Sequence, residues 1–124
     1  MTHVRIKKTR DQARKVLELA EKGDFGNFIH EYQVLLKEQG DIKRELKEVL
    51  PENFPIVKLT EHLAARIPSR VMQNHEGEFL EPKEASQAAT IEEGVFHQLR
   101  LAINMLDKMD HQCRQLKKFF ASIE

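Results

Sequence analysis

Histidine and carboxylate side chains occur in pairs at helical spacing in the second half of the chain. Glu93 and His97 are four residues apart, as are Asp107 and His111, and residues at this spacing share one face of a helix. Each pair could offer two ligands to a metal ion, whereas a zinc site takes three or four protein ligands with further supporting contacts. We therefore expect solvated surface histidines, no metal site and no cofactor.

His97 also belongs to a short pattern of its own. The segment His97-Gln-Leu99-Arg100-Leu101 resembles the phospho-accepting helix of histidine phosphotransfer domains, in which an exposed histidine is followed at the second position by leucine and then by a basic residue. The resemblance implies a helical domain in which His97 accepts phosphate and Arg100 helps to neutralise it. The family's glycine, fourth after the histidine, is replaced by Leu101 in this chain.

No other residue pattern indicates catalysis. The one cysteine, Cys113, falls at an apolar helix position, and we interpret it as a buried thiol that packs like a small apolar residue. The sequence contains no glycine-rich phosphate loop and no nucleophile elbow. We therefore predict a protein that is not an enzyme.

The amino-terminal segment is basic and indicates a charged partner. Arg5, Lys7, Lys8 and Arg10 lie close together, and a flexible basic arm over residues 1–8 could contact nucleic-acid phosphates or an acidic protein. No aromatic residue stands among them for base stacking, and the chain as a whole is neutral, with 20 basic and 20 acidic residues. Nucleic-acid binding is therefore an alternative that we do not favour. A solvated tail, or pairing with the chain's own acidic residues, fits the charges too.

Apolar residues spaced three and four apart predict the helices that position these groups. The expected helices cover residues 9–22, 27–50, 56–67 and 90–122. A turn at 23–26 makes the first two antiparallel neighbours, Gly40 allows either a kink or an unbroken helix, and residues 74–83 form a mobile acidic loop. We predict a single all-α domain over residues 1–124. It is an antiparallel helical bundle built on the 27–50 and 90–122 helices, with the first helix beside them and the proline-punctuated middle capping one end.

The last predicted helix has the most regular pattern, a heptad seam typical of a coiled coil. At about 1.5 Å per residue it would run roughly 50 Å, which is too long for short helices of one small chain to cover. Its apolar edge therefore indicates a partner helix, although a compact bundle that covers the stripe internally stays an alternative. The residues that would form the protein interface are Val95, Leu99, Leu106, Met109, Leu116 and Phe120.

Together these patterns predict a non-catalytic helical interaction module, such as an adaptor, a chaperone-like factor or a regulator. Its partner would be another protein or a second copy of the chain, and we favour a homodimer. No apolar run reaches the ~20 residues of a membrane span, and the first residues lack the apolar region of a secretory signal. We therefore expect a cytoplasmic protein without a membrane partner.

Overall fold

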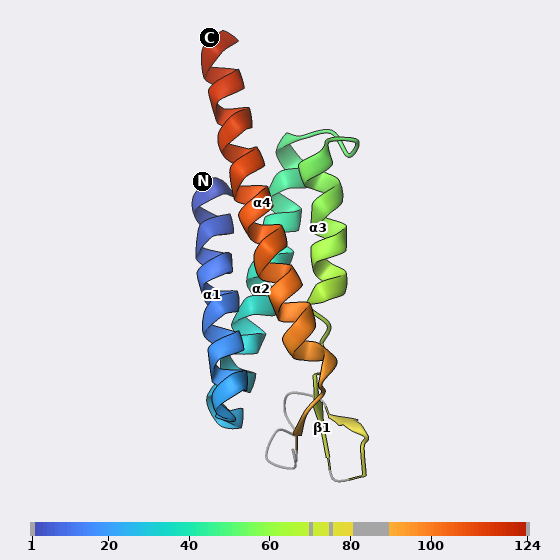
Figure 1. The fold of residues 1–124 in the computed structure, drawn as a ribbon. Helices are drawn as coiled ribbons and strands as arrows, with labels where there is room; N and C mark the ends of the chain where they lie inside the picture. The colour runs from blue at the N-terminus through green and yellow to red at the C-terminus, as the bar shows by residue number, and fades with distance from the viewer. Residues whose placement is uncertain (1, 70, 75, 81–89, 124) are drawn as a thin grey trace.

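Figure 1 shows four helices packed side by side, with short strands at one end of the bundle. The computed structural model describes residues 2–69, 71–74, 76–80 and 90–123. Its helices are α1 (Thr2–Lys22), α2 (Phe25–Val49), α3 (Pro55–Arg66) and α4 (Gly94–Ile123). Buried apolar residues of all four helices form one core. The prediction of an all-α bundle is confirmed.

Each helix packs against two others. α1 and α3 both contact α2 and α4, so the two longest helices, α2 and α4, lie at opposite corners of the bundle. We predicted that these two would form its centre and that the middle of the chain would cap one end. α3 instead lies along the bundle as a full member, because Ile56, Val57 and Leu63 give it a buried apolar face.

The first helix begins earlier than the sequence pattern predicts. Residues 2–8 are the first turns of α1 and not a flexible arm, because Ile6 is fully buried in the core. Thr9 is also fully buried, and its hydroxyl donates a hydrogen bond of 2.8 Å to the Arg5 carbonyl. A hydroxyl that is satisfied within its own helix can be buried at low cost. Ile6, Thr9 and Ala13 therefore extend the buried face of α1 toward its start.

The turn between α1 and α2 follows the predicted chemistry. Gly23 has φ +73°, a conformation that glycine adopts without strain, and the Asp24 carboxylate caps α2 by accepting from the Asn27 amide at 3.4 Å. α2 continues unbroken through Gly40 to Val49. Burial of Ile42 just beyond that glycine outweighs its cost of about 1 kcal/mol in a helix.

A small sheet closes the end of the bundle where α4 begins. Its strands are β1 (Met72–Gln73), β2 (Phe79–Leu80) and β3 (Thr90–Ile91), and β1 pairs antiparallel with the other two. The Asn74 side chain accepts from the amides of Glu76 and Glu78, both at 3.0 Å, and so shapes the turn between β1 and β2. Part of the loop that we predicted at 74–83 is therefore a hairpin; residues 75 and 81–83 lie outside the described residues.

Candidate functional site

Four of the six residues predicted to form an interface on α4 are buried within the chain itself. Val95 is 4% exposed, Leu99 1%, and Leu106 and Met109 are fully buried. α1 and α3 both pack along α4 and provide this cover. Because a side chain enclosed by its own chain has no surface to offer a partner, these four are core residues and not interface residues.

The other two predicted interface residues lie further along α4. Leu116 is half-buried and packs against the edge of the core. Phe120 lies in the last turns of α4, where the structure describes the helix but not that side chain. Figure 1 shows α4 running on past the start of α1 and past the connection between α2 and α3. The predicted apolar seam therefore has a covered part and a part beyond the body of the bundle.

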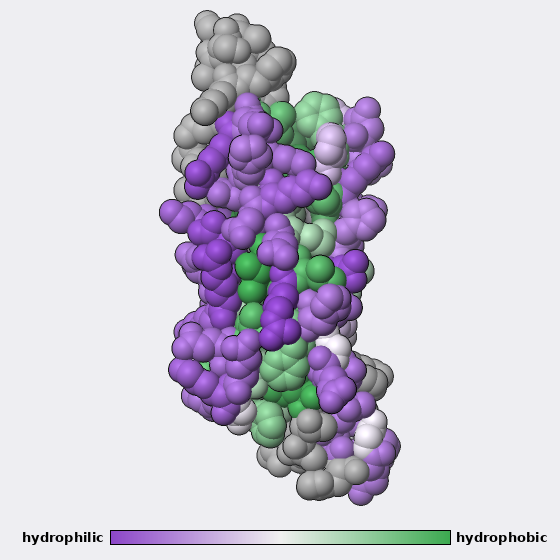
Figure 2. All heavy atoms as spheres, in the orientation of Figure 1, coloured by the Kyte–Doolittle hydropathy of each residue, from purple (hydrophilic) through white to green (hydrophobic). Residues whose placement is uncertain are grey.

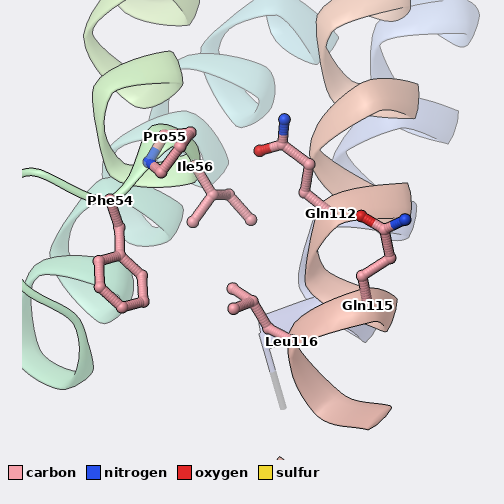
Figure 3. Close-up of a pocket in the computed structure, with 6 residues that line it drawn as sticks. All are labelled: Phe54, Pro55, Ile56, Gln112, Gln115 and Leu116. Atoms are coloured by element: carbon pink, nitrogen blue, oxygen red, sulfur yellow. The ribbon is translucent and has the colours of Figure 1, made fainter. Parts of the chain in front are cut away.

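An apolar cleft lies beside Leu116, between the start of α3 and α4. Its volume is about 400 Å³, and it is lined by Phe54, Pro55, Ile56, Gln112, Gln115 and Leu116. Figure 3 shows the Phe54 ring and the Leu116 side chain on its two sides, with the Gln112 carboxamide reaching from α4 toward Pro55 and Ile56. We call this end of the molecule the open end, comprising residues 49–56 and α4 from Gln112 onward.

Apolar residues reach the surface around this cleft. Val49 is 69% exposed at the last residue of α2, and Leu50 and Phe54 are half-buried in the connection that follows. In Figure 2, hydrophobic residues come to the surface at this end of the bundle. Apolar surface gathered in one place is typical of an interaction surface.

The basic residues near the amino terminus are partly paired within the bundle. The Arg5 guanidinium lies 2.7 Å from Glu45 and 3.6 Å from Asp41 of α2. Arg10 donates a 3.0 Å hydrogen bond to Asp107 of α4, which raises the pKa of Arg10. These two arginines therefore link α1 to α2 and α4 through ion pairs.

Lys7 and Lys8 are exposed on α1. Of the four basic residues predicted to contact nucleic acid, Arg5 and Arg10 form ion pairs with acidic residues of the bundle. Exposed lysines alone are a common feature of helix surfaces. Nucleic-acid binding stays a prediction, and the geometry of the arginines does not favour it.

His97 is exposed on α4, as the resemblance to phosphotransfer domains requires. The Arg100 guanidinium, however, lies 3.3 Å from the Glu21 carboxylate of α1, so it already has an anionic partner. Phosphate transfer through His97 stays a prediction. Among the described residues, no three histidine, cysteine or acidic side chains are grouped to hold a metal ion. No helix of the described chain has the length and apolarity to cross a membrane.

A half-buried carboxylate, that of Glu38, lies between α1 and α2. Within the part of the chain that the structure describes, the Glu38 Oε2 atom is enclosed and has no hydrogen-bond partner. Burial raises the pKa of Glu38, and the nearby Asp41 adds to this; Lys8, Thr9 and Arg5 oppose it. The charged form of Glu38 is therefore unfavourable in the folded state.

We expect Glu38→Gln to stabilise the protein at neutral pH. A carboxyl group whose pKa is raised by folding does not lower the free energy of unfolding at acidic pH, because the folded and the unfolded chain both bind the proton there. It destabilises the folded state as the pH rises through the raised pKa. The gain in the free energy of unfolding should be present at pH 7 and vanish near pH 4, as measured by urea denaturation. Glu48→Gln, at an exposed position of α2, is the control for loss of one carboxylate. An equal gain at both pH values would contradict this reasoning.

Sequence reasoning found one residue of the cleft and missed the others. Leu116 was identified through its heptad position. Gln112 and Gln115 carry no recognisable signal, because glutamine on a helix is usually a solvated surface residue. Phe54 and Pro55 come next to α4 only through the path of α3, which local periodicity does not specify. A signal that could have found them is the apolar residue Phe54 standing between two prolines.

Comparison with known proteins gives no match, whether to a protein-family model, to a curated protein or to a solved structure.

Proposed function

We propose that this chain is a non-catalytic helical interaction module that binds a protein partner at the open end of the bundle. The observation that supports the proposal is the apolar cleft between α3 and α4, which is open among the residues that the structure describes. Clefts of this size with apolar walls and a few polar groups are typical of binding sites. The proposal keeps the predicted function and moves the interface from the covered seam to the end of α4.

The length of α4 also supports an interaction surface at the open end. The helix continues to Ile123, beyond the body of the bundle in Figure 1. Helical turns without tertiary contacts are only marginally stable in water, because most of the stability of a helix in a protein comes from packing of its apolar face. We infer that a partner bound at the open end packs against the final turns of α4. The sequence keeps its apolar heptad spacing there, through Leu116 and Phe120.

Leu116→Asp is expected to abolish partner binding while the bundle stays folded. The substitution places a charge on the wall of the cleft. Loss of packing at an interface residue of this kind weakens binding at least about tenfold. Asn104→Asp, at an exposed position of α4, adds the same charge away from the cleft and is the matched control. The wild type and both variants should give equal helicity by circular dichroism.

The measurement is affinity capture with the three proteins as baits, followed by binding of the purified partner to each. A partner held by the wild type and by Asn104→Asp, and lost with Leu116→Asp, supports the proposal. A partner held equally by all three, or none that rebinds after purification, would refute it. Light scattering across a concentration series identifies a second copy as the partner, if the molar mass doubles from 14.5 kDa and Leu116→Asp prevents the doubling.

A further inference from the structure

None of the six described residues that line the cleft at the open end is charged, and four of them have apolar side chains, Phe54, Pro55, Ile56 and Leu116. A charged group entering such a cleft would lose its hydration without gaining an opposite charge. Charge complementarity therefore selects a neutral occupant with a large apolar body, and the volume of about 400 Å³ accommodates an aromatic side chain.

One polar atom in the wall of the cleft lacks a partner. The carbonyl oxygen of the Gln112 side chain, Oε1, is enclosed and accepts no hydrogen bond within the described residues. Figure 3 shows this carboxamide reaching across the cleft toward Ile56. An enclosed acceptor without a donor is unfavourable, and the last torsion of a glutamine side chain rotates easily. The oxygen has no accessible surface in this arrangement, so a donor that enters the cleft reaches it only after rotation about that torsion.

We propose that the cleft binds an indole group, the side chain of a tryptophan on the partner protein, whose ring N–H donates to Gln112 Oε1. The ring would pack between Phe54 and Leu116. An indole is a donor only, so it satisfies the glutamine oxygen and brings no acceptor of its own, whereas a phenol brings both. Tryptophan is also enriched among the residues that dominate interface energetics. This inference rests on the proposed function and names the anchor of its partner.

The composition of the chain makes the inference testable. The chain has no tryptophan, so a second copy of it cannot supply the indole. The fluorescence of an added indole is observed without background when it is excited at a wavelength that the single tyrosine, Tyr32, does not absorb. The probe is N-acetyl-tryptophanamide, and its matched control is the same compound methylated on the ring nitrogen, which keeps the ring and removes the donor. Both are titrated with the full chain by fluorescence, and amide shifts in NMR spectra locate the site.

We expect saturable binding of the unmethylated probe, with shifts at the residues that line the cleft, and about fivefold weaker binding of the methylated probe because one hydrogen bond is lost. Gln112→Met removes the acceptor at similar length, and the two probes should then bind equally. Gln115→Met changes the neighbouring glutamine and should preserve the difference between the probes. Leu116→Asp should abolish binding of both.

Equal binding of the two probes to the wild type, or shifts away from the cleft, would overturn the inference. Absence of saturable binding would overturn it too. These outcomes are separate from a failure of the proposed function. If the indole probe fails but a purified partner binds the wild type and not Leu116→Asp, the interaction module is upheld and only the indole is rejected. The same holds if the chain forms a dimer that Leu116→Asp dissociates.

Discussion

Leu106→Asp is expected to unfold the protein. Leu106 is fully buried on α4, between the buried residues Ala102 and Met109. The substitution loses about 1.5–3 kcal/mol of apolar burial and places an unpaired carboxylate in the core, which costs several kcal/mol more. The sum approaches the whole stability of a typical domain, about 5–15 kcal/mol. Circular dichroism should show lost helicity, or a thermal transition at a much lower temperature than that of the wild type.

Leu116→Asp is the matched control on the same helix. Leu116 is half-buried beside the open cleft, where a carboxylate can reach water, so the expected loss is about 1 kcal/mol. The pair of variants separates the covered seam from the exposed end of α4. If Leu106→Asp kept the helicity and cooperative unfolding of the wild type, Leu106 would not be in the core, and the seam would again be available as an interface.

The helices themselves were predictable because their signals are local. Apolar spacing along α2 and α4, the capping Asp24 and the turn at Gly23 each depend on a few neighbouring residues. Strands of two residues carry no such signal, because pairing such as Met72 with Leu80 and Ile91 is non-local. The sheet was therefore missed, although it lies at the end of the bundle where α4 begins.

A heptad pattern indicates that one edge of a helix is buried, but it does not indicate whether the same chain or a second chain buries it. Leu99 and Leu106 would show the same spacing whether a second chain or the same chain packed on them. We predicted another chain because the remaining helices looked too short for the task. Two errors made them look short: residues 2–8 were interpreted as an arm, and α3 was interpreted as a cap. With α1 and α3 both lying along α4, the cover is internal.

The start of α1 shows why the first of these errors arose. Ile6 is flanked by Arg5, Lys7 and Lys8, so the segment resembles a basic tail by composition. Only the three-dimensional arrangement shows that Arg5 pairs with Glu45 and that the isoleucine points into the core. The charged residues lie on the outer face of the helix, and the inner face that packs on the core has only a few apolar side chains.

Ile6→Ala is the variant that tests this arrangement. Ile6 is fully buried, and truncation of a buried isoleucine to alanine typically costs about 2–5 kcal/mol through lost burial and the cavity left behind. Alanine is the best helix former, so the loss cannot come from weaker helix propensity. We expect a drop of this size in the free energy of unfolding, measured by urea denaturation with the slope unchanged.

Lys7→Ala changes the adjacent residue, whose side chain is exposed on the same turn, and should leave the free energy of unfolding within about 0.5 kcal/mol of the wild type. In a flexible arm, neither substitution would alter stability, because the segment would be equally disordered in the folded and unfolded states. A large loss with Ile6→Ala alone therefore requires that residues 2–8 be packed. Equal stability of the two variants would mean that the first turns of α1 do not contribute to the core, and it would restore the basic arm as a candidate surface.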